Sequence, residues 1–294
     1  MRITNKYGLP RTILNAIERD DYSKGDARIS VTGLLKPPRI GLLYAKHNNQ
    51  IEKDVTDYIW SLFGRATHKI LEMGGDEEHI PEERLFAEVR GWRISGQIDV
   101  QKLDTSHVDI TDYKVTAARS VMSEKSEWVQ QLNSYRWLLE TATSYKVRKL
   151  AVCAFVRDWS RHQAGASDKY PQQPMVMIDI PLWGMNEAAS FIEERVRVHQ
   201  HAQAHWDMGN EPAHCTDEER WMRPAKFAVR KLTNKRATKV FDTALEAATC
   251  AKEMGAEFVV DTRPGEPIRC AGDYCNVSQW CSQYRDWLDI NGRD

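Results

Sequence analysis

Apolar positions in the first half of the chain change from helical spacing to strand spacing. Across residues 51–73 they recur every three or four residues, which predicts an amphipathic helix that ends at Gly74 and Gly75. Three short apolar segments follow, and the turn-forming residues between them predict an antiparallel meander of strands. These segments are residues 85–92, 94–103 and 108–115.

The alternation continues beyond the meander with a helix, two strands and a long helix. The expected elements are residues 127–141, 147–156, 175–180 and 186–206. The order of helix, three strands, helix and strand predicts a mixed α/β domain. Ahead of it, residues 9–19 predict a helix, and residues 30–40, which contain Gly33 and two prolines, predict a loop.

The composition changes near residue 211, which predicts two domains, residues 1–210 and residues 211–294. Residues 220–241 hold eight lysines and arginines and no acidic residue. A short helix over residues 245–254 and a strand over residues 257–262 follow, and then a group of cysteines. We therefore expect a small, basic, metal-binding module after the mixed α/β domain.

Bulk composition limits the class of protein more than its function. The chain has 294 residues, 41% of them hydrophobic and 28% charged, which is ordinary for a globular protein. It has no apolar run of the roughly 18 residues that span a membrane, and no apolar run typical of a signal peptide near Met1. We expect no membrane partner and a cytoplasmic location. The net charge of −1 neither favours nor excludes a polyanionic partner.

Acidic residues near the ends of two predicted strands suggest phosphodiester chemistry. Asp112 and Lys114 point to the same face of a strand, because side chains two apart share a face. An antiparallel neighbour would bring Asp99 beside them. Hydrolysis of a phosphodiester needs a divalent cation held by hard oxygen ligands, and these acids would supply them. The alternative is a structural ion pair.

Three further polar side chains have both functional and structural interpretations. His68, on the predicted helix before the meander, is either a metal ligand or a half-buried helix histidine. Gln131 and Tyr135 are four residues apart on the next helix, so they face the same way. They could hold Lys114 or a phosphate, or simply form helix surface.

Four motifs occur in a fixed order along the chain. They are G-x-x-x-H at Gly64 to His68, G-x-I-D at Gly96 to Asp99, D-x-K at Asp112 to Lys114, and Q-x-x-x-Y at Gln131 to Tyr135. Together they resemble the RecB-like branch of the PD-(D/E)XK nucleases. The resemblance covers about residues 50–160 and implies a mixed-sheet, restriction-endonuclease-like core of the order α-βββ-αβ.

The resemblance also implies roles for these residues. Asp99 and Asp112 would bind Mg²⁺ or Mn²⁺ together with His68, and Lys114 would position or help to deprotonate the attacking water. Gln131 and Tyr135 would steady the site and the DNA. Glu88, on the strand before Asp99, is a further candidate acid.

The implied activity is that of a metal-dependent DNA nuclease, in particular an exonuclease. Residues 30–40 and 155–160 are similar to segments of phage and prophage nucleases, which suggests phage or mobile-element DNA processing or recombination, in the host cytoplasm. The chain has no G-x-x-x-x-G-K-[ST] motif, so a helicase or recombination partner would be another chain. A catalytically idle DNA-binding or scaffold protein and an RNA-directed nuclease are the alternatives.

Three cysteines close to the end of the chain have a spacing near that of metal ligands, but longer than the C-x2-C typical of zinc ribbons. Cys270, Cys275 and Cys281 follow C-x4-C-x5-C, and Cys215 is the expected fourth ligand, with His214 as the fallback. Thiols or a metal site are favoured over disulfides in a chain without an export signal. Cys153 and Cys250 fall within a predicted strand and helix and are expected to be buried thiols.

Some RecB-like nucleases close their domain with a [4Fe-4S] cluster on one upstream and three carboxy-terminal cysteines. In those relatives the first cysteine precedes the histidine motif, whereas here no cysteine precedes Cys153. A [4Fe-4S] cluster, Zn²⁺ and free thiols therefore all stay open, because thiolates suit either metal.

The basic tract is interrupted by apolar residues that predict a hairpin turning at residues 233–235. Such a hairpin would display Arg230, Lys231, Lys235 and Arg236 to DNA phosphates. The alternative is an ordinary solvated face.

Overall fold

The computed structural model describes residues 1–19 and 23–292, which form two compact units. Unit 1 is Met1–Pro38 with Glu52–Met208, and unit 2 is Arg39–Ile51 with Gly209–Asp294. The sequence analysis placed residues 39–51 in the first domain, but in the structure they pack with the carboxy-terminal residues. Buried contacts of Arg39 with Pro212 and Cys281 account for this grouping.

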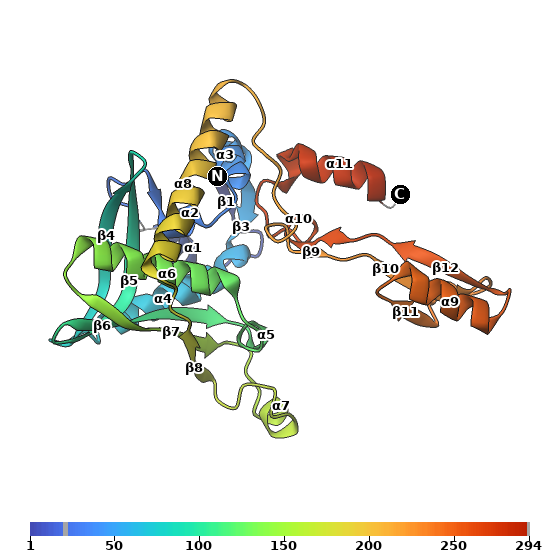
Figure 1. Ribbon diagram of the computed structural model, residues 1–294, viewed down its shortest axis with the longest axis horizontal. Coiled ribbons are helices and arrows are strands. Elements are labelled where there is room, and N and C mark those ends of the chain that lie inside the picture. Colours follow the sequence, from blue (N-terminus) through green and yellow to red (C-terminus); the bar gives the residue numbers. More distant parts are fainter. Residues whose placement is uncertain (20–22, 293–294) are drawn as a thin grey trace. The chain divides into compact units, whose positions relative to one another are not determined.

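Unit 1 is built on a mixed sheet that has six strands within the described residues (Figure 1). The strands are β2 (Ile29–Ser30), β4 (His79–Val89), β5 (Trp92–Asp104), β6 (His107–Thr116), β7 (Lys146–Val156) and β8 (Met175–Ile180). The order is β2-β5-β6-β7-β8, and β4 pairs with the other edge of β5. The predicted antiparallel meander of β4, β5 and β6 is confirmed. Strand β7 then joins β6 in parallel and β8 in antiparallel orientation.

Helices α6 (Ser126–Ala142) and α8 (Met185–Asp207) bury the apolar side of this sheet (Figure 1). Helix α6 contacts β4 to β8, and α8 packs on α6 and β4. The core contains residues that are fully or almost fully buried: Ile94, Ile98, Ile110, Leu132, Leu138, Leu150, Val152 and Ile192. Burial of each such side chain contributes about 1.5–3 kcal/mol, so this layer fixes the strands that carry the acids.

The helix predicted over residues 51–73 begins later than expected. Residues Glu52–Asp54 form β3, which pairs in parallel with β1 (Arg2–Thr4), and Val55–Tyr58 form a short 3-10 helix, η2. Helix α4 then runs over Ile59–Glu72. Asp54 terminates the strand because its carboxylate accepts from the backbone N–H of Thr56, as an N-cap does.

The lead-in is more helical than the sequence indicated. Helix α1 (Arg11–Glu18) is confirmed, but the loop expected at residues 30–40 is wrong. The Ser30 hydroxyl caps α2 (Val31–Leu34), and Pro38 begins α3 (Pro38–His47). Proline suits the first position of a helix because its fixed φ is already helical and its missing N–H has no partner there.

Strands β5 and β6 separate part-way along their length. Their ladder ends at the pair Val100 and Thr111, whereas β2 pairs with the same edge of β5 only at Ile94 and Ser95. Residues 96–99 therefore have no strand on this edge. The result is a fork in the sheet whose arms are β5 and the second half of β6.

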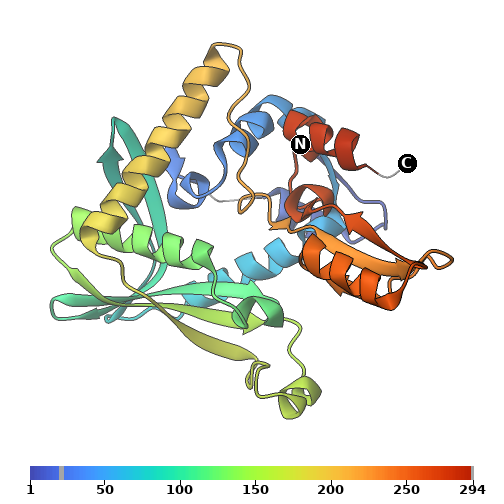
Figure 2. The same ribbon diagram turned by 45° about the vertical axis from the view of Figure 1, so that its right-hand side comes forward.

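Unit 2 contains a small antiparallel sheet, ordered β11-β10-β12, with helix α9 along one face (Figure 2). These elements are β10 (Lys226–Lys231), β11 (Lys239–Phe241), α9 (Ala244–Met254) and β12 (Phe258–Arg263), and they confirm the predicted hairpin, helix and strand. The remaining short elements of the two units are η1 (Asn48–Gln50), α5 (Ala118–Val121), α7 (Arg161–Ala166), β9 (Met222–Arg223), β13 (Glu266–Pro267), α10 (Ile268–Ala271), η3 (Ser278–Trp280) and α11 (Ser282–Asn291). Among the described residues, no helix is both long and apolar enough to cross a membrane.

Candidate active site

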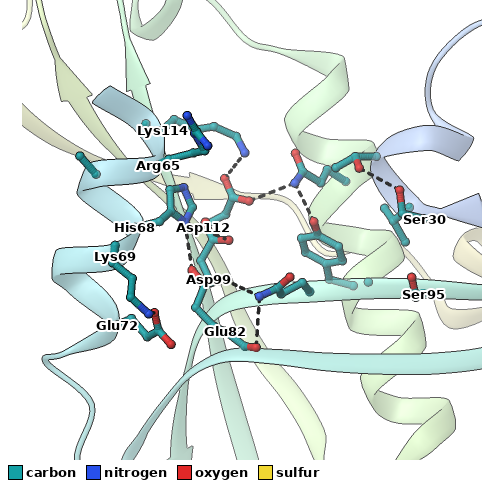
Figure 3. Close-up of a pocket in the computed structure, with 18 of the residues that line it drawn as sticks. Ser30, Arg65, His68, Lys69, Glu72, Glu82, Ser95, Asp99, Asp112 and Lys114 are labelled. Atoms are coloured by element: carbon teal, nitrogen blue, oxygen red, sulfur yellow. Dashed lines mark hydrogen bonds and ion pairs between the residues drawn. The ribbon is translucent and has the colours of Figure 1, made fainter. Parts of the chain in front are cut away.

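Three carboxylates form a row across the fork in the sheet (Figure 3). Asp99 and Asp112 occupy facing positions directly beyond the last β5–β6 pair, Val100 and Thr111. On the other edge of β5, strand β4 pairs with β5 directly before and directly after this position. Glu82 of β4 therefore lies opposite Asp99 of β5. Like charges that face each other across strands repel, so this row costs stability unless a cation joins it.

Glu82 is a site residue that the sequence analysis missed. Its backbone has φ 55°, in the left-handed region that a residue with a side chain rarely adopts, and the β4–β5 ladder is interrupted at this position. Glu88, the acid offered instead, is exposed, faces Arg93 and does not line the site. The hairpin turn at Gly91 was the available signal, because counting back from it puts Glu82 opposite Asp99.

His68 extends from α4 toward two of these acids (Figure 3). Its Nδ1 lies 3.1 Å from Glu82 Oε1 and 3.7 Å from Asp99 Oδ1. Ligand atoms of His68, Glu82 and Asp99 all fall within 4.8 Å of one another. The other oxygen of Asp99 accepts from the backbone N–H of Tyr113 at 2.6 Å, so β6 fixes the orientation of this carboxylate.

Asp112 is held by side chains from two elements. It is 1% exposed, and its Oδ2 forms an ion pair with Lys114 Nζ but accepts no hydrogen bond. Gln131 Nε2 of α6 donates to Asp112 Oδ1 at 3.1 Å and to the Tyr135 hydroxyl at 2.9 Å. Gln131 thus contacts an acid of the site, which agrees with the steadying role that the resemblance implied, and Lys114 is paired with Asp112 instead.

The acids and the histidine change one another's protonation. Burial raises the pKa of Asp99 to about 7, and the nearby Asp112 carboxylate adds to this effect. The hydrogen bond to Glu82 raises the pKa of His68, and the charges of Asp99 and Asp112 reinforce it. The group therefore holds protons that a divalent cation would displace.

A pocket of about 730 Å³ opens over the fork and is lined by all six residues predicted for this site. These are His68, Asp99, Asp112, Lys114, Gln131 and Tyr135. The lead-in forms part of the wall with Arg19, Ser30 and Thr32, and α4 adds Arg65 and Lys69. Arg65 donates to the backbone carbonyls of Ala16 and Arg19, which ties α1 to α4.

Gly96, from the second motif, allows α6 to approach β5 closely. A Cβ at this position would lie 2.6 Å from Leu138 Cδ1 and 2.9 Å from the Tyr135 ring. Such distances are too short for carbon atoms in contact. The absence of a side chain at Gly96 therefore leaves room for Tyr135, whose hydroxyl accepts from Gln131, and Gln131 in turn donates to Asp112.

The four cysteines predicted to share a metal interact electrostatically within unit 2. Cys215 interacts with Cys275 and Cys281, and Cys270 interacts with the same two. Gln283 holds the Cys215 backbone through both its N–H and its carbonyl. The other two cysteines belong elsewhere: Cys153 to β7, and Cys250 to the core beneath α9. The fallback ligand, His214, is exposed.

The basic hairpin is less positively charged in the structure than in the sequence. Arg230 forms an ion pair with Asp261, and Lys231 with Glu257, both from the segment that pairs with β10. Four cations were predicted to bind DNA. Of these, only Lys235 and Arg236 are exposed and have no ion pair with another described residue. A charge run in sequence does not reveal acids that the fold brings beside it.

Comparisons with known proteins bear on the family. The model of the PD-(D/E)XK nuclease superfamily matches residues 38–282. A comparison with curated proteins gives no significant match. The solved structure of a protein named SSO0001 is similar with a TM-score of 0.44 and 18% identity, covering 64% of this chain and 85% of that one. A "Putative exonuclease" from Eubacterium rectale gives a TM-score of 0.33 and 14% identity, covering 63% of this chain and 65% of the other.

Both TM-scores are low, so these two structures add no argument about the site. The family model, in contrast, extends over most of the chain and includes the fork, the pocket lining from residue 62 onward and all four clustered cysteines. The mixed sheet with its α-βββ-αβ order agrees with the core of that superfamily. The chain belongs to the PD-(D/E)XK nuclease superfamily.

Proposed function

We propose that this protein is a divalent-metal-dependent DNA nuclease, and specifically an exonuclease of the RecB-like branch. The observation that carries the proposal is the row of Glu82, Asp99 and Asp112 at the fork, with His68 and Lys114 beside it. A protein that only binds DNA would have no use for facing carboxylates that destabilise its own sheet.

The residues at the fork fit a divalent cation of the Mg²⁺ or Mn²⁺ type. Carboxylate oxygens are the ligands that both ions prefer, and an imidazole suits Mn²⁺ as well. The buried Oδ2 of Asp112 has two lone pairs and one partner, Lys114, so a cation could share this oxygen. His68, Glu82, Asp99 and Asp112 would hold the ion, which supplies charge to neutralise phosphate oxygens and to acidify water.

The protein side chains would then orient the reacting groups. Lys114 lies against Asp112, where its ammonium can donate to a water or to a phosphate oxygen. Arg65 and Lys69 add positive charge to the wall of the pocket and favour a polyanionic substrate. Tyr135 and Gln131 keep Asp112 in position.

We assign the substrate as DNA and place the protein in phage or mobile-element DNA processing or recombination. The support is the likeness of residues 30–40 and 155–160 to segments of phage and prophage nucleases. Lys235 and Arg236 at the turn of the basic hairpin are proposed contacts to phosphates.

A cleavage assay tests this function. The substrates are end-labelled linear and circular DNA, single and double stranded, and an RNA of the same sequence. Each is incubated with Mg²⁺, Mn²⁺ or EDTA. Cleavage of linear DNA alone supports an exonuclease, and cleavage of circles indicates an endonuclease. Metal-independent binding without any cleavage would identify an idle scaffold protein. Cleavage of RNA alone would identify an RNA-directed enzyme.

Variants at the fork should separate catalysis from folding. Asp112→Asn and Lys114→Ala are expected to reduce cleavage at least about 100-fold, because each removes charge that acts on the reacting phosphate. Binding of DNA in EDTA should change little. Turnover equal to that of the wild type in both variants would overturn the assignment of this site.

A further inference from the structure

Aromatic rings lead from the nuclease site across β6 to β7. The rings of His68 and Tyr113 are edge to face, with centroids 6.2 Å apart, and Tyr113 contacts Phe155 in the same manner at 6.3 Å. Both Tyr113 and Phe155 are half-buried. An aromatic row thus begins at a candidate metal ligand and reaches the neighbouring strand.

A second pair of rings lies in solvent at the start of α4. Trp60 is 48% exposed and Phe63 is 47% exposed, and their centroids are 5.8 Å apart. The guanidinium carbon of Arg157, the residue directly after β7, lies 3.9 Å from the centroid of the Trp60 ring. Half-exposed rings add little to a core, and neighbouring apolar side chains left in water mark interaction surfaces. Trp60, Phe63 and Arg157 form what we call the Trp60 surface.

Backbone contacts place the Trp60 surface close to the nuclease site. The backbone N–H of Arg157 donates to the Thr116 carbonyl at 2.9 Å, and Thr116 is two residues beyond Lys114 on β6. Helix α4 carries both Trp60 and His68, eight residues or about 12 Å apart along its axis. A strand with a phosphate at the fork would therefore have its adjacent nucleotides within reach of Trp60.

The elements around Arg157 carry more positive than negative charge. A small apolar cluster holds α5, the end of β7 and α7 together. Residues 117–121 and 157–170 include four cations and two acids, and one of these acids, Asp158, is engaged by the backbone N–H of Ala118. The cations are Arg119, Arg157, Arg161 and Lys169, and all four are exposed. This surplus favours a polyanion over an apolar protein partner.

Unpaired nucleotides are the ligand that fits rings beside cations. An indole or phenyl ring stacks on any of the bases, and guanidinium N–H groups donate to phosphates. In a duplex each base is already stacked between its neighbours, so its faces cannot reach a side chain on a protein surface. The Trp60 surface therefore matches a single strand and does not match a duplex.

We propose that the Trp60 surface is a stacking site for unpaired nucleotides and holds a single strand of DNA beside the site of cleavage. Trp60 and Phe63 stack on bases, and Arg157 orients the indole with its planar face while its outer N–H groups donate to a phosphate. The inference rests on the proposed function, because it names the form of DNA that the same site receives.

Binding in EDTA tests the stacking site without any need for cleavage. The ligands are a fluorescent oligothymidylate and a duplex of the same length, and the variants are Trp60→Phe and Trp60→Leu. Trp60→Leu loses the ring and should bind the single strand at least about fivefold more weakly, whereas Trp60→Phe keeps a ring and should lose less. The affinity for the duplex should be unchanged in both. An unchanged affinity of Trp60→Leu for the single strand, or an equal loss for the duplex, would overturn the inference.

The stacking site and the proposed function can fail separately. An active nuclease whose single-strand binding is unaffected by Trp60→Leu would refute the stacking site alone. A protein that cuts no DNA with Mg²⁺ or Mn²⁺, yet shows the expected loss in EDTA, would refute the nuclease function and leave the stacking site in place.

Arg157→Gln has a matched control in Arg28→Gln. Arg28 is also exposed and lies 5.3 Å from the centroid of the Trp92 ring, but Trp92 begins β5 and is seven residues, about 23 Å, from Asp99. Arg157→Gln should weaken single-strand binding several-fold and reduce its salt dependence, and Arg28→Gln should match the wild type. Equal losses in both variants, or no loss in either, would refute the role of Arg157.

Photocrosslinking locates the bound strand in the protein without substitutions. A single strand that contains one 5-iododeoxyuridine is irradiated in EDTA, and the crosslinked tryptic peptide is identified by mass spectrometry. The expected peptide is residues 54–65, which holds both rings. Crosslinks confined to other peptides, such as those of the basic hairpin, would overturn the inference.

Discussion

Glu82 shows how strand pairing, and not a motif, can specify a site residue. No short pattern marks it, yet the two-residue turn at Gly91 fixes the register that brings it opposite Asp99. Its φ is in the left-handed region, and Gln97 Nε2 donates to its carboxylate at 2.7 Å. Strained backbone of this kind is found at functional sites, where surrounding contacts hold it.

A pair of isosteric substitutions on β4 tests this role. Glu82→Gln removes one negative charge beside His68 and Asp99, whereas Glu88→Gln does so on an exposed part of the same strand. We expect Glu82→Gln to weaken Mn²⁺ binding at least about tenfold and Glu88→Gln to leave it unchanged. Calorimetric titration of each variant gives the comparison, and equal affinities would remove Glu82 from the metal site.

The protons held by Asp99 and His68 predict how metal binding depends on pH. Asp99 has a pKa raised to about 7, and the hydrogen bond with Glu82 raises the pKa of His68, so acidification adds protons to both groups that compete with a cation. Affinity for Mn²⁺ should rise as the pH increases from 6 to 8, with release of protons on binding. Titrations in buffers of different ionisation enthalpy measure that release. A flat affinity over this range would contradict the coupling.

At the scale of elements, two glycines near the site have opposite structural roles. Gly96→Ala would push a methyl group into Leu138 and Tyr135, and overpacking of this kind costs about 1–3 kcal/mol. Gly64, inside α4, has open space around a built Cβ, so Gly64→Ala should stabilise the helix by about 0.5–1 kcal/mol. Thermal unfolding of the two variants should shift in opposite directions. A shift in the same direction would show that the contact at Gly96 is not limiting.

A half-buried histidine between α8 and the lead-in predicts sensitivity to acid. His199 Nε2 lies 3.0 Å from the Leu34 carbonyl, and burial lowers the pKa of His199 from 6.5 to about 4. The unfolded chain takes up this proton below pH 6.5 and the folded chain does not, so stability is lost as the pH falls from 6.5 toward 4. The loss is up to about 3 kcal/mol.

Denaturant unfolding between pH 7 and pH 4.5 measures this effect. His199→Gln should lose less stability over that interval than the wild type, whereas His162→Gln, at an exposed position of α7, should follow the wild type. Identical pH profiles in all three proteins would assign the acid sensitivity to other groups.

The sequence predicted the strands and helices of the nuclease core because their apolar residues follow the spacing of the faces they bury. It also predicted that the side chains of Asp112 and Lys114 lie together, since residues two apart in a strand share a face. The contacts of Arg39 and the acids that neutralise Arg230 were not predictable, because they join residues 173 and 31 positions apart. Such pairs depend on tertiary packing and leave no local pattern.

At the scale of the whole molecule, the two units have separate cores, and the fork belongs to unit 1 whereas the four clustered cysteines belong to unit 2. The core under α6 and α8 belongs to unit 1, and the cluster of Val229, Ala247 and Ala251 belongs to unit 2. A ligand stabilises only the part that binds it, by about 2.7 kcal/mol at a concentration 100 times its dissociation constant. The two sites should therefore protect different segments.

Hydrogen exchange followed by mass spectrometry can observe both units in one experiment. Mn²⁺ should slow exchange in α6 and β5 without affecting α11. Cys275→Ser, at the predicted cysteine site, should speed exchange in α10 and α11 while leaving α6 unchanged. An effect of either change on both units would mean that they unfold as one.

The division of unit 2 along the chain has a consequence for its biosynthesis. Arg39 is made early, but its partners Glu211, Pro212, Cys281 and Ser282 follow 172 to 243 residues later. Chains fold from the amino-terminal end as they leave the ribosome, so every strand of the central sheet emerges before α3 can reach its partners. The four cysteines can come together only after residue 281 has emerged, so their assembly is among the last events of maturation. A nascent chain stalled before residue 281 would carry a finished sheet and an exposed, unpartnered α3.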